Sequence, residues 1–285
     1  MIRFGTCSWK YEAWKGIIYS DERNINFLNE YSAHYSTVEI DQWFWSLFPP
    51  DKVVLPDYKT VENYKNSVPD DFLFTIKIPN SLTLTHFYNR NKNEPLVVNP
   101  YFLSVNLFEE FLNTLKPIEK NIGCLIFQFE YLNKQKMKSI SMFLEKIYQF
   151  QSELSKVIHP IGIEIRNPNY LSSNYFESLE SLNFFHVFLE GYYMPPVIEV
   201  YEKNKKYIKD ISVIRLHGPD RKGIEKIANN NWSKIYLDRA KEISSIVQMI
   251  KELENNEVDL FVNVNNHFEG SAPLTIERIR NVLGK

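Results

Sequence analysis

Residues 162–166 have the sequence Gly162-Ile163-Glu164-Ile165-Arg166, in which apolar and charged side chains alternate. A period of two is typical of a β-strand whose two faces differ. Strands of an open parallel sheet, covered by helices on both sides, normally read as continuous apolar runs. The charged face of this strand therefore favours a closed barrel, in which one face of each strand lines the interior or its carboxyl-end mouth.

Similar short β-like runs recur along the whole chain. We expect strands over residues 2–8, 37–40, 72–78, 124–129, 162–166, 184–189, 212–217 and 260–264. Apolar residues at helical spacing separate them, with stripes at 27–35, 107–115, 137–147 and, beginning at Ile235, 235–253; a last helix is expected over 272–283, with Ser271 as N-cap and Pro273 in its first turn. Strands that alternate with helices pair in parallel. We predict an α/β fold, a single TIM (β/α)8 barrel spanning residues 1–285 as one domain, with a doubly wound open sheet as the rival.

Composition excludes several classes of protein. The chain has 285 residues, of which 44% are hydrophobic and 24% charged, as in soluble globular proteins. We expect a cytoplasmic protein that does not bind membranes, because no apolar run is long enough to span a bilayer and the start lacks a signal-peptide core. A net charge of −2 excludes a strongly basic nucleic-acid binder, and two cysteines exclude a disulfide framework and a CxxC zinc site. The sequence contains no glycine-rich nucleotide loop.

Polar side chains interrupt most of the expected strands. Burying an unpaired charge costs several kcal/mol, so these groups must pair with one another, with water or with a ligand. The charged members number two acids and three bases, which leaves one positive charge to spare. An internal ion-pair network and a ligand-binding cluster at the strand ends, where active sites of this fold lie, both remain open. The polar residues are Glu39, Lys77, Gln128, Glu164, Arg166, Arg215, His217, Asn263 and Asn265.

The loops that follow four of the strands add two further features. Tryptophans and other aromatic residues follow the first two strands, and they either stack on a ligand or pack on the barrel rim: Trp9, Tyr11, Trp14, Tyr19, Trp43, Phe44 and Trp45. The loops 217–223 and 265–271 either form an anion site with the amino terminus of the last helix or are solvated turns.

Seven motifs in order resemble the strand-end motifs of the YecE-like family (domain of unknown function 72). They are Gly5-Thr6-Cys7-Ser8-Trp9, Val38-Glu39-Ile40-Asp41, Phe74-Thr75-Ile76-Lys77, Phe127-Gln128-Phe129, Ile163-Glu164-Ile165-Arg166, Arg215-Leu216-His217-Gly218 and Asn265-Asn266-His267. The resemblance covers nearly the full chain and implies a TIM barrel with a polar cluster at its carboxyl-end mouth, without implying an established activity. It also adds His86, because Thr85-His86 stands where the family has a threonine–histidine pair. Residues 41–45 depart from the family pattern.

We therefore predict a net-basic site that binds a small phosphorylated or other anionic ligand, and whether the protein also hydrolyses or isomerises that ligand stays open. Glu39 and Glu164 are candidate acids or bases, and His217 is a candidate proton shuttle. The candidate ligand-binding residues are Ser8, Trp9, Lys77, His86, Gln128, Arg166, Arg215, Asn265, Asn266 and His267.

Other functions stay open at this point, including whether the protein is an enzyme. A non-catalytic nucleotide or nucleic-acid binder would use the aromatic rim with Arg221 and Lys222. A glycoside hydrolase would pair Glu39 with Glu164, but the adjacent bases keep both carboxylates ionised, whereas one must be protonated. A metal would recruit Glu39, Glu164, His217 and His267, yet the neighbouring cations disfavour a dication, so no metal or cofactor is predicted. The sequence sets no oligomeric state.

Overall fold

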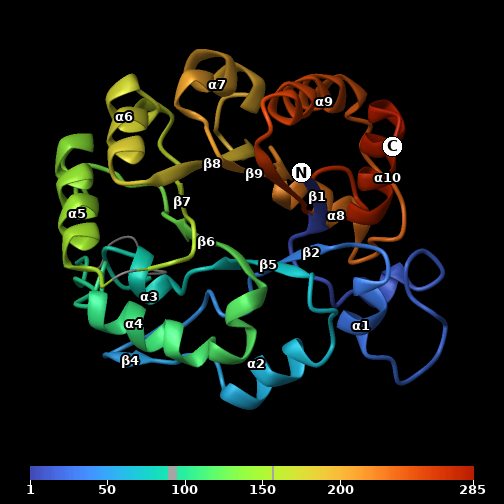
Figure 1. Cartoon of the computed structure of the whole chain (residues 1–285), viewed down its shortest axis with the longest axis horizontal. Helices are drawn as coiled ribbons and strands as arrows, with labels where there is room; N and C mark the ends of the chain where they lie inside the picture. The colour runs from blue at the N-terminus through green and yellow to red at the C-terminus, as the bar shows by residue number, and fades with distance from the viewer. Residues whose placement is uncertain (89–94, 156) are drawn as a thin grey trace.

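The computed structural model describes residues 1–88, 95–155 and 157–285, and its centre is a nearly closed barrel of parallel strands (Figure 1). The order β1-β10-β9-β8-β7-β6-β5-β2 places each barrel strand beside its neighbour in the chain, which confirms the TIM-type barrel over the doubly wound sheet. The barrel strands are β1 (Ile2–Thr6), β2 (Thr37–Ile40), β5 (Leu73–Lys77), β6 (Ile122–Gln128), β7 (Ile161–Glu164), β8 (Phe184–Gly191), β9 (Ile211–Gly218) and β10 (Asp259–Val264).

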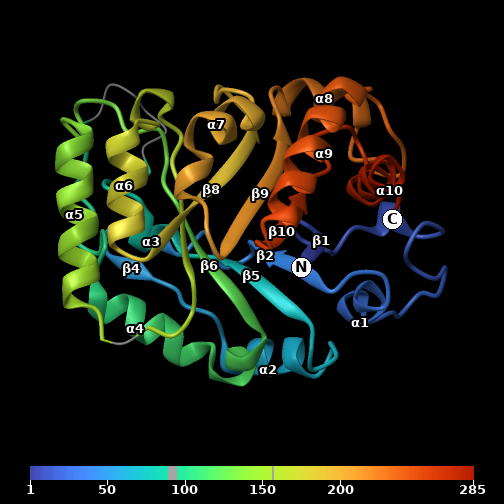
Figure 2. The same ribbon diagram turned by 45° about the horizontal axis from the view of Figure 1, so that its top comes forward.

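Helices surround these strands in both views (Figures 1 and 2). They are α1 (Phe27–Ser32), α2 (Tyr58–Lys65), α3 (Asn80–Thr83), α4 (Val105–Thr114), α5 (Ile140–Glu153), α6 (Ser173–Ser181), α7 (Val197–Asn204), α8 (Arg221–Ala228), α9 (Ala240–Asn255) and α10 (Ala272–Leu283). The 3-10 turns are η1 (Glu12–Trp14), η2 (Lys116–Asn121), η3 (Pro168–Tyr170) and η4 (Lys205–Tyr207), and a hairpin joins β3 (Leu47–Phe48) to β4 (Lys52–Val53).

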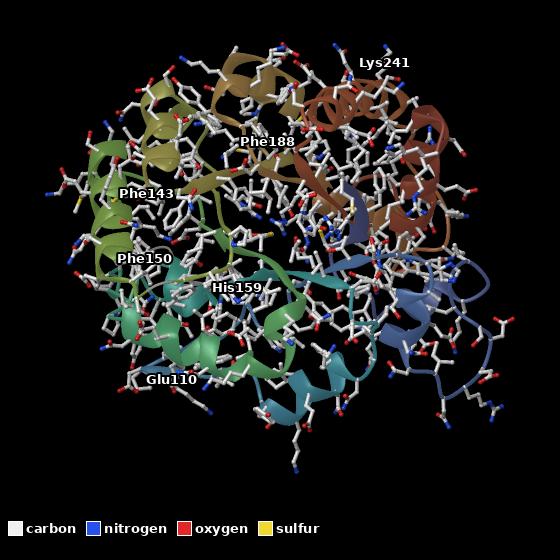
Figure 3. The ribbon with its side chains drawn as sticks, in the orientation of Figure 1. Glu110, Phe143, Phe150, His159, Phe188 and Lys241 are labelled. Atoms are coloured by element: carbon white, nitrogen blue, oxygen red, sulfur yellow. The ribbon has the colours of Figure 1, made fainter. Side chains whose placement is uncertain are left out.

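The helix α5 shows why these segments fold as they do. Ser139 caps its amino terminus by accepting a hydrogen bond from the amide of Met142 (3.1 Å), and the helical spacing of its apolar residues buries one face. Phe143 and Phe150 lie on that face, between the helix and the strands, whereas Glu110 of α4 and Lys241 of α9 are exposed (Figure 3). Phe143 and Phe150 are thus packed between the surrounding helices and the barrel strands.

Three details differ from the sequence expectations. Ile235 lies before α9, which begins only at Ala240, and the loop expected over 217–223 runs into helix α8 at Arg221. Asp220 starts α8 by accepting a hydrogen bond from the amide of Gly223 (2.9 Å). Ser271 occupies the N-cap position of α10 but makes no side-chain cap.

The seam between β1 and β2 closes the barrel with one isolated bridge, Cys7 with Glu39, instead of a continuous ladder. A side chain takes over part of the missing ladder. The hydroxyl of Tyr31, on α1, accepts a hydrogen bond from the amide of Thr6 (2.8 Å) and donates one to the carbonyl of Thr37 (3.1 Å). Tyr31 is fully buried, so these bonds are shielded from water.

The barrel interior is divided between an apolar and a polar end. An apolar cluster fills the half nearer the amino ends of the strands; it consists of Cys124, Ile126, Val187, Val213 and Phe261. The polar side chains with period-two spacing occupy the half nearer the carboxyl ends. The inward-facing polar side chains of β2, β5, β6, β7, β9 and β10 therefore meet near the mouth.

Candidate functional site at the barrel mouth

Arg215, on β9, is the centre of the polar cluster. Its Nε and Nη2 donate to the two carboxylate oxygens of Glu39, on β2, at 2.7 Å each, and its Nη1 donates to Glu164 of β7 and to Gln128 Oε1 of β6 (3.1 Å). These bonds use four of the five N–H groups of the guanidinium. Arg215, Glu39 and Glu164 are all buried, so Arg215 pairs with both carboxylates inside the barrel, and one negative charge is left for the neighbouring cations to balance.

Two further groups complete this inner layer. Asn263 of β10 donates to Glu39 Oε2 (3.2 Å) and to the hydroxyl of Thr75 (2.8 Å). Arg166, just beyond β7, donates through Nε to Glu164 Oε1 (3.2 Å). Burial alone would raise the pKa of Glu164, but Arg215 and Arg166 hold it below its usual value. Glu164 is therefore an ionised group at neutral pH.

Arg166 and Lys77 form an outer layer that is partly open to solvent. The side chain of Arg166 is 26% exposed and its guanidinium lies over the ring of Tyr192, 4.5 Å from the centroid. Within the described residues only Nε of Arg166 is hydrogen-bonded, which leaves both terminal amino groups available. Lys77 Nζ lies 3.8 Å from the centroid of Phe44 and makes no ion pair within the described ranges.

Lys77 has an acidic neighbour that the sequence reasoning did not include among the site residues. The pairing of Glu39 with Thr75 and of Ile40 with Ile76 places Asp41 beside Lys77 as the two strands end. Burial, together with Arg215, lowers the pKa of Lys77 to about 8. Burial, together with Glu39, raises the pKa of Asp41. With Asp41 included, three acids balance three bases at the mouth, so the positive surplus expected from five residues does not extend to the full set.

His217 lies in a chain of hydrogen bonds at the end of β9. Cys7 donates its thiol proton to the carbonyl of Asn263 (3.7 Å), so that its sulfur can accept from His217 Nε2 (3.6 Å). The hydroxyl of Tyr192 then donates to His217 Nδ1 (3.1 Å). Burial, reinforced by Arg215 and Arg166, holds the pKa of His217 well below its usual range, so the ring is neutral.

Two residues at the mouth hold left-handed backbone conformations that are unfavourable for side chains other than glycine. Ser8 has φ 80° and Tyr192 has φ 55°. Such conformations cost about 1–3 kcal/mol each and concentrate at functional sites. Ser8 is held in place by its amide, which donates to the carbonyl of Glu39 (3.1 Å), and its hydroxyl accepts from Gln42 Nε2 (3.3 Å).

Of the two roles considered for the tryptophans after the first two strands, the structure favours packing on the barrel for most of them. Trp9 and Trp14 are buried in the core, and Trp9 packs edge-on against Tyr64, which also stacks on Trp43. Only Trp45 of this group is exposed, at 61%. Most of the aromatic side chains in these loops pack over the barrel rim, because burying a large ring stabilises the fold more than exposing it to water.

The remaining predicted residues lie in the loops around the mouth. His267 Nε2 is hydrogen-bonded to Glu225 of α8 (3.1 Å). The side-chain oxygen of Asn265, Oδ1, accepts a hydrogen bond from the backbone amide of His267 (2.9 Å). Asn266 Oδ1 accepts from the first amide of α10, at Ala272 (2.8 Å). His86 bonds the hydroxyl of Thr85 (2.9 Å), and its charged neighbours are Lys136 and Glu130 rather than the central cluster.

A buried carboxylate that the sequence reasoning missed ties the last two loops together. Glu269 accepts hydrogen bonds from Arg278 Nη1 (2.5 Å) and from the hydroxyl of Thr275 (2.8 Å), both on α10, and from the amide of Arg239 (3.1 Å). Asn266 thus occupies the first amide of α10, whereas Glu269 bonds side chains of this helix rather than its backbone amides. Asp41 was recognisable from its period-two spacing after Glu39; Glu269 sits in a loop without periodicity.

A cavity of about 510 Å³ lies at the other end of the barrel, between the ends of α5 and α6, the turn η4 and the starts of β7–β9. Its walls are mainly apolar, with Phe176, Phe184 and Ile208 among them. Its charged pair, Lys209 with Glu180, is mutually satisfied at the surface. The cavity also contains His159 and His186, whose pKa values are lowered by burial. The buried carboxylates, the arginines and Lys77 cluster at the mouth, so we place the candidate site there.

Over residues 1–88, 95–155 and 157–285, no three His, Cys, Asp or Glu side chains converge as a metal site would require. The four residues considered for a metal, Glu39, Glu164, His217 and His267, bond instead to Arg215, Cys7, Tyr192 and Glu225 as described above. In the same ranges no helix is both long and apolar enough to cross a membrane.

Comparison with known proteins gives a consistent result. The sequence model of a family described as "Protein of unknown function DUF72" matches residues 3–285. The UPF0759 protein YunF of Bacillus subtilis (strain 168) is 22% identical over 264 residues, which are 86% of this chain and 82% of that protein.

Two solved structures share the fold. A DUF72-family protein of Enterococcus faecalis V583 superposes with a TM-score of 0.69 at 19% identity, covering 100% of this chain and 96% of that one. A DUF72-family protein of Thermotoga maritima MSB8 superposes with a TM-score of 0.65 at 19% identity, covering 100% of both chains.

Proposed function

We propose that this protein, which belongs to the DUF72 family, binds a small anionic ligand at the carboxyl-end mouth of its barrel. One observation carries the proposal. The inner arginine, Arg215, is consumed by carboxylates, whereas the outer cations Arg166 and Lys77 keep donors that no described residue occupies. Two parallel N–H groups of an arginine fit a carboxylate or phosphate in bidentate fashion, and a lysine adds a point charge.

The inner cluster supports this ligand site from below. Glu164 orients Arg166 by accepting a hydrogen bond from its Nε, and the guanidinium packs on the ring of Tyr192 on one side. Because Glu39 and Glu164 are already bonded to Arg215, we assign them the role of holding the cations in place. His217 is neutral and both of its ring nitrogens are bonded to Cys7 and Tyr192, so we assign it no charge toward the anion.

Thermal unfolding with and without anions tests the proposal. We expect inorganic phosphate, sugar phosphates or nucleotides to raise the melting temperature of the wild type. An anion at ten times its dissociation constant stabilises by about 1.4 kcal/mol, or roughly 2–3 °C for a chain of this size. The shift should fall by more than half in Lys77→Met and Arg166→Gln.

Lys209→Met is the matched control, because it also removes one positive charge but at the opposite end of the barrel. It should keep the full shift. The proposal is wrong if none of these anions stabilises the wild type, or if the three variants respond alike.

A further inference from the structure

We propose that Lys77 forms an imine with the carbonyl group of an aldehyde or ketone that also carries an anionic group. The inference rests on the proposed function, because the same anion site would hold the other end of this ligand. It adds a covalent role that anion binding alone does not require.

The surroundings of Lys77 suit a nucleophilic amine. Nζ lies against the ring of Phe44 (3.8 Å to the centroid), and no carboxylate of the described residues forms an ion pair with it. A lysine that is tightly paired to a carboxylate is held as an ammonium, which has no lone pair. Burial and Arg215 lower the pKa of Lys77 to about 8. At pH 7 the neutral fraction of such an amine is on the order of 100-fold larger than that of an ordinary lysine.

Asp41 provides the acid that imine formation needs. The β2–β5 register places Asp41 next to Lys77, because the backbones of neighbouring strands lie about 5 Å apart. Burial and Glu39 raise its pKa, which favours the protonated carboxyl. Arg166 follows β7, two strands from Lys77, with Gln128 of β6 between them, so that an anion on Arg166 and a carbonyl at Lys77 belong to one short ligand.

The step balances without any other reactant. The lone pair of neutral Lys77 Nζ forms the C–N bond while the carbonyl π electrons move to oxygen, and a proton passes from nitrogen to that oxygen to give a carbinolamine. Asp41 then protonates the hydroxyl group, the C–O bond breaks, and water leaves as the nitrogen lone pair forms the C=N bond. The products are an iminium on Lys77, its counter-ion the carboxylate of Asp41, and one water.

Trapping by cyanoborohydride tests this inference on the full-length protein. We use glyceraldehyde 3-phosphate as the probe at pH 7, reduce any imine, and read the modified lysines by peptide mass spectrometry. Labelling of Lys77 should be at least tenfold faster than that of Lys222, an exposed lysine in the first turn of α8, which follows the carboxyl end of β9. Equal labelling of the two lysines would overturn the inference.

The variant Asp41→Asn separates an acid from a mere neighbour. Asp41 raises the pKa of Lys77, so removing its charge should leave more neutral amine. If Asp41 acts only through its charge, labelling becomes faster or stays unchanged, which contradicts the acid role. If Asp41 donates the proton, labelling of Lys77 falls severalfold, although a larger fraction of the Lys77 amine is neutral in the variant.

Glycerol 3-phosphate and glyceraldehyde distinguish the two proposals. Stabilisation by glycerol 3-phosphate without selective labelling by glyceraldehyde 3-phosphate supports the anion site and overturns the imine. Selective labelling by both aldehydes without stabilisation by glycerol 3-phosphate supports an imine at Lys77, but it overturns the anion site and, with it, the requirement that the carbonyl compound carry an anionic group. Absence of both effects overturns both.

Discussion

Arg215 accounts for the charged side chains inside this barrel. Its guanidinium forms a bidentate pair with Glu39 and also bonds Glu164 and Gln128, so each buried carboxylate has a cationic partner. The sequence indicated that these groups share one face, because their period-two spacing is visible in each strand. It did not indicate that Arg215 would be consumed internally and Arg166 left available, because that division depends on side-chain reach across the barrel.

Replacing Arg215 should strongly destabilise the protein. Arg215→Met leaves the buried Glu39 without its cationic partner and Glu164 with Arg166 alone, which costs about 3–5 kcal/mol. Urea unfolding at pH 7 measures this as a lower transition midpoint. Arg166→Gln, at the partly exposed rim, is the control and should cost less than about 1 kcal/mol. Equal losses in the two variants would contradict the central role of Arg215.

His186 makes stability depend on pH. It is buried among Phe176, Phe188 and Tyr175, and burial lowers its pKa to about 3. The unfolded chain binds a proton near pH 6.5 that the folded ring accepts only near pH 3, so the free energy of unfolding falls as pH drops through this window, by up to ~1.4 kcal/mol per pH unit for this group. His217 acts with the same sign.

We expect His186→Asn, in which the side-chain amide can replace the ring as the partner of Tyr175, to reduce this dependence. Urea unfolding at pH 7, 6 and 5 compares the slopes of the two proteins. Parallel slopes for wild type and variant would show that His186 is not buried in its neutral form.

At the scale of elements, the strands and five of the ten described helices followed from the sequence, and the other helices and the connections did not. Hydrophobic periodicity places all eight barrel strands and the last helix, Ala272–Leu283, because both depend on which face is buried. Helix α8 and the Glu269 loop were missed, since a cap such as Asp220 and a buried loop carboxylate depend on single contacts. The seam between β1 and β2 was equally invisible, because a side chain from α1 closes it.

Tyr31→Phe should therefore open this seam. The change removes the hydroxyl that joins the amide of Thr6 to the carbonyl of Thr37, and an unsatisfied buried group costs about 1–3 kcal/mol. Hydrogen exchange should be faster at the amides of Thr6 and Ser8 than in the wild type. Tyr35→Phe, whose hydroxyl bonds no described residue, should leave those amides protected; faster exchange there as well would contradict the assignment.

At the scale of the whole molecule, the barrel separates stability from the candidate site. The interior near the amino ends of the strands is apolar, while the mouth holds the balanced charges, the strained Ser8 and Tyr192, and the outer cations. The family relatives share this fold at about 19% identity. The mouth is thus where we propose that Arg166 and Lys77 bind an anion.

Anomalous diffraction from crystals soaked in selenate tests that claim most directly. Selenate has the shape and charge of sulfate, and its selenium atom is located without reference to the phases of the protein. We expect an anomalous peak at the mouth, with selenate oxygens within hydrogen-bond distance of the terminal amino groups of Arg166 and of Lys77 Nζ. We expect this peak to be lost in Arg166→Gln. A mouth without a peak, or a peak that persists unchanged in Arg166→Gln, would contradict it.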